Sequence, residues 1–304
     1  MQVAIVIPTF RREEQLARLW ESLLKSSYMP AEIIIVNNAS HTLSSGEQFL
    51  ADGIDVKVLD AKLGPNVAEA RNIGWRASAS ELVFFIDDDN VVPPQTIERL
   101  VDRFRSSVQA GLIAPISLIG SSDLIWCSGI VRTPLLARTI STGAFTKWER
   151  QNIISSTCDA PNAFMIPRRV LEEIGGFDSS RFPIHYEEAD IGERMRQLGY
   201  RLYYDWNASV EHHANIVGIG SEWSRVANSA GGLGRVRLSS RSRTIFVRRH
   251  SRGIKRLTRI YLGLPLWLTV VVLYVAFDRS PVSLKLKLAK AILQGTMEGL
   301  KVGI

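Results

Sequence analysis

Short runs of consecutive apolar residues alternate with stretches of helical periodicity in the first third of the chain. The apolar runs are typical of strands and cover residues 3–7, 32–36, 56–59 and 82–86. The stretches with helical spacing or a helix-start signal are residues 12–26, residues 67–79 and a segment that starts at Pro94. Strands without polar alternation, separated by helices, predict a parallel sheet covered on both faces, and therefore an α/β fold.

The second half of the chain is less regular. Its pattern predicts strands at residues 163–166, 201–204 and 208–211, and helices at residues 169–174 and 189–198. A run of 18 uncharged residues follows at 260–277, and an amphipathic helix with three lysines follows at 284–300. We therefore predict a folded domain over 1–220, an Arg-rich linker or amphipathic segment over 221–259, and apolar and amphipathic helices over 260–304.

Composition places the positive charge of the chain in one segment. The 304 residues carry a net charge of +7, but residues 235–259 hold ten Lys and Arg and no acidic residue. Apart from Phe246 this segment lacks the interleaved aromatic residues of many nucleic-acid-binding segments, and it adjoins an apolar run, so we do not expect nucleic-acid binding. Two cysteines, Cys127 and Cys158, make no disulfide framework and fit a reducing compartment.

Polar residues follow three of the predicted strands, where α/β sheets bind their ligands. They are Pro8 and Thr9, Asn37 and Asn38, and the run Asp87, Asp88 and Asp89. Two unit charges about 5 Å apart repel by roughly 3 kcal/mol at an effective dielectric of about 20. We therefore expect a positively charged group close to the three carboxylates. A solvated acidic turn before the next helix is the alternative.

Six segments, in order, resemble the family 2 glycosyltransferases, which have the GT-A fold, a Rossmann-like mixed sheet flanked by helices. The segments read VAIVIPTFRR, EIIIVNNAS, AEARNIGWRAS, ELVFFIDDDN, NAFMIPRRVLEEIGGFD and YEEADIGERMRQLGYRLYY, and the resemblance covers residues 3 to 213. The chain is similar in particular to rhamnosyl- and galactofuranosyl-type transferases with a membrane-associated C-terminus.

The resemblance implies a nucleotide-sugar donor whose diphosphate is bound through Mn²⁺ or Mg²⁺, ions that prefer oxygen ligands. It implies Asp87, Asp89 and His212 as metal ligands, with Asp88 nearer the ribose. The remaining residues that it assigns to the nucleotide-sugar are Pro8, Thr9, Arg12, Asn37, Asn38 and Arg71. The family usually has Asp at the position of Asn37, so the identity of the base stays open.

The acidic cluster before residues 189–198 supplies the candidate catalytic base. The resemblance implies that Glu188 takes the proton from the acceptor hydroxyl, with Glu187 as the fallback and Asp190 in the same cluster. Because acidic side chains also favour the start of a helix, a purely structural role is the alternative, above all for Asp190.

These features together predict an inverting, metal-dependent glycosyltransferase at the cytoplasmic face of the cell membrane, acting on a lipid-linked or cell-envelope glycan. The basic segment would meet anionic lipid, and the lysines beyond residue 277 favour an in-plane or re-entrant helix pair over a single crossing. The alternatives are transfer to a polyprenyl phosphate, a catalytically silent scaffold of the same fold, and an apolar run buried in a soluble cap. The oligomeric state stays open.

Overall fold

The computed structural model describes residues 1–39, 43, 49, 51–64, 66–107, 109–213, 232–277 and 281–304. The chain forms two compact units. The sheet unit comprises Met1–Val131, Ser141–Ser179 and Glu188–Ala214, and the helical unit comprises Arg132–Ile140, Ser180–Glu187 and Asn215–Ile304. The domain boundary predicted at residue 220 lies outside the described residues.

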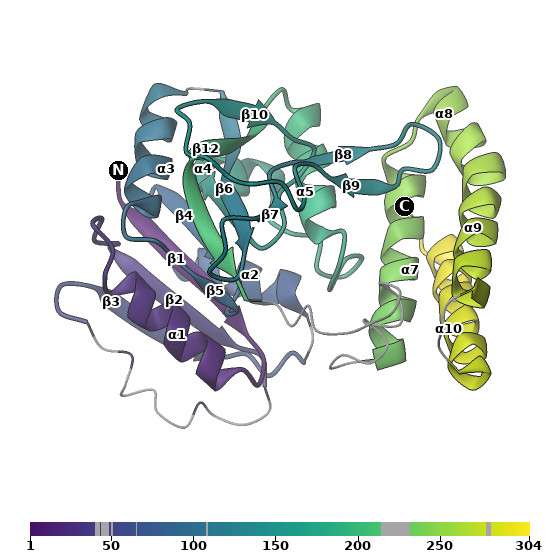
Figure 1. Cartoon of the computed structure of the whole chain (residues 1–304), viewed down its shortest axis with the longest axis horizontal. Coiled ribbons are helices and arrows are strands. Elements are labelled where there is room, and N and C mark those ends of the chain that lie inside the picture. The colour runs from purple at the N-terminus through teal and green to yellow at the C-terminus, as the bar shows by residue number, and fades with distance from the viewer. Residues whose placement is uncertain are drawn as a thin grey trace. The chain divides into compact units, whose positions relative to one another are not determined.

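A ten-stranded mixed sheet forms the centre of the sheet unit (Figure 1). Its main path, from edge to edge, is β10 (Ile154–Ser156), β12 (Arg201–His212), β6 (Ala110–Ile119), β11 (Ala163–Pro167), β4 (Leu82–Ile86), β1 (Val3–Thr9), β2 (Glu32–Asn37) and β3 (Asp55–Asp60). Two short strands join it from the side, β5 (Asn90–Val91) on β12 and β7 (Ile125–Cys127) on β6. A separate two-stranded sheet pairs β8 (Ile130–Arg132) with β9 (Thr139–Ser141).

The sheet is mixed, and the parallel arrangement predicted from the first four apolar runs is observed for those four strands. Strands β3, β2, β1 and β4 are parallel, but β11 runs antiparallel between β4 and β6. An apolar run shows that both faces of a strand are buried, and it contains no information on the direction of the neighbouring strand. The mixed sheet implied by the family resemblance is confirmed, and the parallel pattern holds for the first four strands and for β6 with β12.

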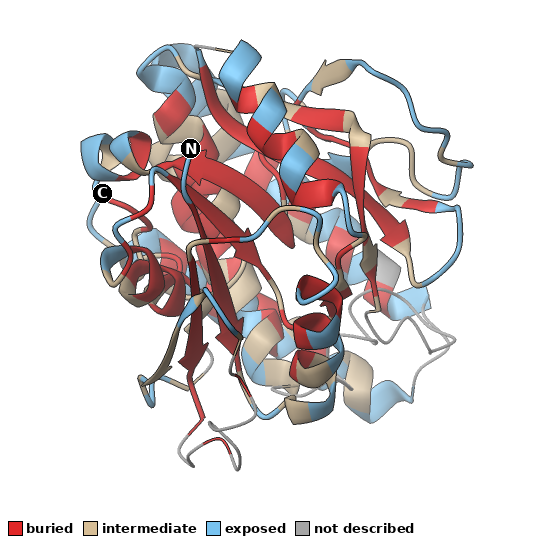
Figure 2. Ribbon diagram, turned by 90° about the vertical axis from the view of Figure 1, so that its left-hand side faces the viewer, coloured by how far each residue is buried: buried red, intermediate tan, exposed pale blue. Residues whose placement is uncertain are grey.

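Alternate side chains of each central strand enter two apolar layers, which accounts for the buried strands in Figure 2. Ala4 and Val6 pack in the layer of α2, whereas Ile5 and Ile7 pack in the other layer. The helices of the sheet unit are α1 (Glu13–Leu23), α2 (Val67–Arg76), α3 (Thr96–Ser106), α4 (Arg168–Ile174) and α5 (Glu187–Gln197). Each fully buried large apolar side chain contributes about 1.5–3 kcal/mol.

Helix α2 lies unusually close to β1. A Cβ atom at Gly74 would overlap the side chain of Val6, so a glycine is needed where the helix crosses the strand. Asn66 begins the helix with a side-chain oxygen that accepts from the backbone N–H of Glu69 at 3.0 Å. The cap and the close crossing fix α2 in register, and α2 carries Arg71 at its buried face.

Two local predictions from the sequence need correction. Strand β12 is continuous through residues 201–212, although two separate strands were predicted, and a register shift between Asp205 and Ser209 accounts for the broken pattern. Helix α3 begins at Thr96, two residues after Pro94, because residues 94 and 95 form a turn.

Residues 221–259 were expected to form an Arg-rich linker or amphipathic segment. Most of the described part of this segment is helical, in α7 (Gly232–Arg249) and α8 (Gly253–Thr258).

The helical unit is completed by the π-helical turn η2 (Arg259–Gly263), α9 (Leu264–Phe277) and α10 (Val282–Lys301). Two glycines of α10 let it approach α7: a Cβ at Gly295 would overlap the carbonyl oxygen of Arg237, and one at Gly299 would be 2.7 Å from that of Arg241. Arg248 donates to the carbonyl oxygens of Gly299 and Val302 at 2.8 and 2.7 Å, which satisfies the end of α10.

An apolar stripe faces outward along α9. Leu266, Val270, Leu273 and Phe277 recur at helical spacing and are all exposed. The opposite side of the same helix packs inside the unit through Leu264, Trp267, Val271 and Val275. Among the described residues, Gly253–Phe277 is one helical segment of 25 residues that is long and apolar enough to cross a membrane, a property that core helices of soluble proteins share.

Candidate active site

The candidate site lies at the edge of the sheet where the parallel strands end. Strands β1 and β2 end at Thr9 and Asn37, and the acidic run begins directly after β4. Strand β12 ends at the same edge with His212, which pairs with Asn90 of β5. The local geometry therefore brings together residues that are more than 200 positions apart in the sequence.

Asp88 points into the protein. Its Oδ2 accepts a hydrogen bond from the Thr9 hydroxyl at 2.8 Å, and its Oδ1 accepts from Arg12 Nη1 at 3.0 Å. Burial raises the pKa of Asp88 to about 7, although Arg12 acts in the opposite direction. These contacts give Asp88 a role in holding the turn after β4 against β1.

Arg12 is the first positive partner of the acidic run. The same Nη1 that contacts Asp88 also lies 2.8 Å from Asp89 Oδ2, so one guanidinium nitrogen bridges two neighbouring carboxylates. Its side chain is 41% exposed. The bridge offsets part of the repulsion between the two aspartates.

Arg71 is the second positive partner, and it is almost completely buried, with 1% of its side chain exposed. Its Nη2 donates to Asp87 Oδ1 at 2.9 Å, and its Nη1 donates to Glu188 Oε1 at 2.8 Å. The guanidinium also lies 5.2 Å from the ring centre of Phe164 and 5.7 Å from that of Phe177. Arg71 therefore connects the end of β4 to the first turn of α5.

Glu188 is held in a mostly buried position by this contact. Burial raises the pKa of the Glu188 carboxyl, the charge of Arg71 lowers it, and the nearby Asp87 raises it again. The net direction is upward. A carboxylate with a raised pKa is a better proton acceptor than an exposed one, which suits a general base.

Asp89 and His212 face each other. His212 Nε2 lies 3.5 Å from Asp89 Oδ1, and the His212 ring packs edge-on against Trp126 with the ring centres 4.4 Å apart. Burial tends to raise the pKa of Asp89, but the interactions with His212 and Arg12 outweigh it and hold that pKa below its usual value. The backbone N–H of His213 donates to the carbonyl oxygen of Asp89 at 2.8 Å and fixes the two segments together.

Two of the three expected metal ligands thus meet. Two ligands about 2.1 Å from an octahedral ion lie roughly 3 Å apart, close to the observed Asp89–His212 separation. Asp89 Oδ1 is buried and has no hydrogen-bond partner among the residues that the structure describes, which suits a ligand atom. Asp87 is turned to Arg71, and no three His, Cys, Asp or Glu side chains converge within the described residues. The donor set fits a divalent cation that takes its other ligands from a bound diphosphate or water.

The side chains of Asn37 and Asn38, which we expected to bind the nucleotide, form hydrogen bonds with neighbouring residues at the edge of the sheet. Asn37 Nδ2 donates to Asp60 Oδ1 at 2.8 Å, and Asn37 Oδ1 accepts from the N–H of Ala39. Asn38 Nδ2 donates to the carbonyl oxygen of Asn66 at 3.2 Å. Both side chains are buried. Pro8 lies inside β1, opposite Val36.

The other two acidic candidates occupy the first turn of α5 with Glu188. Asp190 is fully buried and accepts from Arg194 Nε at 2.8 Å. Arg194 in turn donates to the carbonyl oxygens of Ile174 and Gly176, so Asp190 orients an arginine that holds the preceding loop. Glu187 is the first residue of α5 and is buried.

Two asparagines that the sequence analysis did not identify stabilise the acidic turn. Asn90 and Asn162 exchange side-chain hydrogen bonds of 2.8 and 2.7 Å, and Asn90 also donates to the carbonyl oxygen of Asp87 at 2.8 Å. Asn162 has a φ of 77°, which Asn tolerates better than most residues. In the sequence, this role of Asn90 was indicated only by its position directly after the three aspartates.

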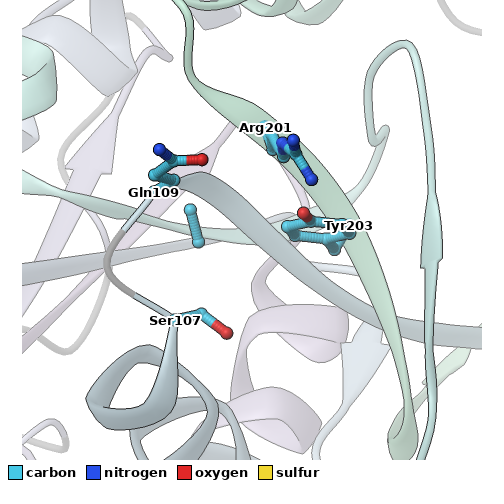
Figure 3. A pocket seen from close by; sticks show the side chains of 5 residues that line it. Ser107, Gln109, Arg201 and Tyr203 are labelled. Atoms are coloured by element: carbon cyan, nitrogen blue, oxygen red, sulfur yellow. The ribbon is translucent and has the colours of Figure 1, made fainter.

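A hollow of the sheet unit lies away from the acidic site. It has a volume of about 420 Å³ and is lined by Ser107, Gln109, Ala110, Arg201 and Tyr203 (Figure 3). Arg201 and Ala110 begin β12 and β6, so this hollow is at the edge where those parallel strands start. It is separate from the acidic site at the opposite edge, and α/β folds bind their ligands at the latter.

Comparisons with known proteins agree with this fold. The sequence model described as glycosyl transferase family 2 matches residues 4–175. The chain therefore belongs to glycosyl transferase family 2.

Individual relatives are more distant. The chain is 27% identical over 215 residues to the pre-mycofactocin glycosyltransferase of Mycobacterium tuberculosis, covering 69% of this chain and 42% of that protein. It is 26% identical over 227 residues to the O-antigen biosynthesis protein RfbC of Myxococcus xanthus, covering 70% of this chain and 17% of that protein. The chain thus spans less than half the length of these relatives.

The fold is similar to that of a crystal structure of GalNAc-T7 with UDP, GalNAc and Mn²⁺. The TM-score is 0.59 at 17% sequence identity, and the match covers 80% of this chain and 47% of that one. The GT-A fold expected from the sequence is confirmed by this likeness.

The buried double contact of Arg71 predicts a large loss of stability on substitution. Arg71→Met would leave Asp87 and Glu188 without their shared cation and should lower the free energy of unfolding by about 3 kcal/mol. The matched change Arg12→Met, at a side chain that is 41% exposed, should cost about 1 kcal/mol or less. Urea denaturation followed by tryptophan fluorescence compares the two, and equal losses would contradict a special role for Arg71.

Proposed function

We propose that this protein is an inverting, metal-dependent glycosyltransferase that moves a sugar from a nucleotide-sugar to a lipid-linked or cell-envelope glycan. The single observation that carries the proposal is the Arg71 bridge, which holds Glu188 next to the acidic run that follows β4. A proton acceptor and a donor-side acidic motif are thus connected through one buried cation. This arrangement suits displacement at a sugar carbon, in which a base and a leaving diphosphate act together.

Glu188 is the proposed base. It accepts the proton of the acceptor hydroxyl while that oxygen bonds to the anomeric carbon, and the bond from this carbon to the nucleoside diphosphate breaks. Attack opposite the leaving group inverts the configuration. Arg71 holds the carboxylate through Oε1, which leaves Oε2 to receive the proton.

Asp89 and His212 are the proposed metal-holding residues. The bound cation would supply Lewis-acid stabilisation of charge on the departing diphosphate. Mn²⁺ in the GalNAc-T7 structure supports the choice of Mn²⁺ or Mg²⁺. Arg12 and Asp88 hold the turn in place, and Asp87 fixes Arg71.

The proposed class of acceptor has less support than the proposed roles of Glu188, Asp89 and His212. The O-antigen role in the name of RfbC favours a polysaccharide or its lipid-linked precursor. Transfer to a polyprenyl phosphate is the second candidate, because the exposed apolar stripe of α9 suits a lipid environment. An ionised phosphate needs no base, so the two candidates differ in their need for Glu188.

We propose that the helical unit attaches the protein to the cytoplasmic face of the membrane in an in-plane orientation. The exposed apolar residues of α9 continue on α8 and η2 as Ile254, Leu257 and Tyr261. Exposed basic residues accompany them at Lys255, Arg256, Lys287 and Lys290. An apolar face bordered by positive charge is typical of helices that lie at the surface of anionic bilayers.

The role of Glu188 is tested by Glu188→Gln, which keeps the size of the side chain but cannot take the proton. Transfer should fall at least about 100-fold while donor binding is retained. Glu187→Gln is the matched control on the same helix and should transfer normally. If both variants transfer the sugar normally, the acceptor is already ionised, and this result favours a polyprenyl phosphate as the acceptor.

Metal dependence is tested by donor binding. UDP, GDP and dTDP are titrated by calorimetry with and without Mn²⁺, into wild type, Asp89→Asn, His212→Ala and the control His213→Ala. His213 pairs with Glu211, so its removal should leave binding intact. The Mn²⁺-dependent gain in affinity should be lost only in the first two variants. Identical affinities with and without Mn²⁺ in wild type would refute the metal proposal.

Membrane attachment is tested by sedimentation with vesicles that contain anionic lipid. Hydrophobic burial does not depend on ionic screening, so the full chain should stay with the vesicles in 1 M salt and be released by detergent. Leu266→Asn with Leu273→Asn, both at exposed positions, should make binding sensitive to salt without unfolding the protein. The proposal is wrong if the full-length protein is monodisperse without detergent and does not sediment with the vesicles.

A further inference from the structure

The tip of the β8–β9 hairpin, residues 133–138, belongs to the helical unit, although it lies far before η2 in the sequence. Hydrogen bonds within this hairpin tip close it into a turn. The backbone N–H of Thr133 donates to the carbonyl oxygen of Arg138 at 3.1 Å, and the backbone N–H of Arg138 donates to Thr133 Oγ1 at 3.0 Å. The hairpin tip therefore has a defined shape, which the sequence analysis did not identify.

The hairpin tip contacts η2 through two successive carbonyl groups. Arg259 Nε donates to the carbonyl oxygen of Pro134 at 2.8 Å. A Cβ at Gly263 would lie 2.5 Å from the carbonyl oxygen of Leu135, so a glycine is needed for the hairpin tip to come this close. Since Arg259 and Gly263 are four positions apart, they lie on the same side of the helical segment. The hairpin tip thus packs on one side of η2.

Two neighbouring leucines of the hairpin tip have different surroundings. Leu136 packs against the apolar cluster of α7, α9 and α10, and its carbonyl oxygen accepts a hydrogen bond from Arg243. Leu135 is 40% exposed, and Arg138 is exposed as well. Leu136 therefore anchors the hairpin tip to the helices, whereas Leu135 stays at the surface.

The place at which the hairpin tip packs relates it to the apolar stripe of α9. Steps of three and four residues lead from the contact positions 259 and 263 to the exposed residues of that stripe, Leu266, Val270, Leu273 and Phe277. Positions at this spacing lie along one side of a helix. The hairpin tip therefore covers the start of the stripe, and the exposed part of Leu135 adds to its apolar surface.

The charged side chains beside this surface all have the same sign. Residues 132–140 and 253–277 include five Lys and Arg and no Asp or Glu. Among them, Arg138, Lys255 and Arg256 are exposed. An apolar surface bordered by positive charge alone is complementary to a bilayer that contains anionic lipid. The charge pattern therefore favours a lipid surface over a protein partner as the group that covers Leu135.

We propose that the hairpin tip is a second membrane contact of the helical unit, in which Leu135 enters the apolar layer beside the stripe of α9 and Arg138 meets anionic headgroups. The inference rests on the proposed membrane attachment and deepens it, because it assigns part of the contact to a segment far from the apolar run in the sequence. Because the backbone of Pro134 and Leu135 is joined to η2, the hairpin tip and the stripe should enter the membrane together.

The location of Leu135 is tested with a fluorescent label in the full-length protein. Cys158→Ser removes the half-buried thiol, and Cys127 is buried, so Leu135→Cys can be labelled with a nitrobenzoxadiazole group, whose emission depends on its contact with water. Vesicles of phosphatidylcholine and phosphatidylglycerol should shift the emission to shorter wavelength, and brominated lipid should quench it. The matched control Leu198→Cys, at a position 52% exposed in the sheet unit, should show neither change.

Affinity for the same vesicles provides a second readout. Leu135→Asp should weaken binding at least about ten-fold, because it replaces an apolar side chain with a charge that anionic lipid repels. Arg138→Gln should weaken binding about five-fold, and this loss should vanish on vesicles without phosphatidylglycerol. Leu198→Asp should bind like wild type. Melting temperatures measured without vesicles should be unchanged in all three variants, which separates a loss of binding from a loss of folding.

The outcomes distinguish this inference from the proposed membrane attachment. If wild type sediments with the vesicles, but the label at residue 135 stays in water and Leu135→Asp binds normally, the inference is wrong and the helices attach without the hairpin tip. If wild type does not sediment, both are wrong. A shift of the label that needs no vesicles and rises with protein concentration would assign the hairpin tip to an interface between copies of the chain and overturn the inference.

Discussion

The candidate site depends on one buried arginine that satisfies two carboxylates from distant parts of the chain. Arg71 forms ion pairs with Asp87, after the end of β4, and with Glu188, in the first turn of α5. Two aromatic rings lie beside its guanidinium. Without this cation the two acidic groups would repel each other in a mostly dry environment. The close crossing of α2 over β1 at Gly74 is what brings Arg71 to that position.

The three consecutive aspartates have separate surroundings, which explains how a fold can tolerate them. Asp87 is paired with Arg71, Asp88 is buried against Thr9 and Arg12, and Asp89 faces His212. Two arginines thus offset part of the negative charge before any ligand binds. Within the described part of the chain, Asp89 Oδ1 has no hydrogen-bond partner.

The helical unit is held together by close helix packing instead of by buried ion pairs. Glycines let α7 and α10 approach closely, and α9 packs one side against them while it exposes an apolar stripe on the other. Its basic residues are placed in two ways. Some are exposed along α8 and α10, whereas Arg243 is buried beside Trp267.

The sequence by itself determined the class of fold and the edge of the sheet at which the candidate site residues gather. Four apolar runs predicted β1 to β4 within one or two residues, and polar groups at the strand ends predicted the place of the site, because both follow from local periodicity and from strand direction. It did not reveal β6, where Pro115 interrupts the apolar run, or the direction of β11. It left residues 221–259 as an Arg-rich linker or amphipathic segment, because Gly, Ser and Arg indicate little locally and packing against α10 supplies the stability of α7. Only the tertiary structure decided the partners of the charged residues: the sequence marked Arg71 and Glu188 as site residues, but 117 positions separate them, and their contact exists because the sheet places α2 beside α5.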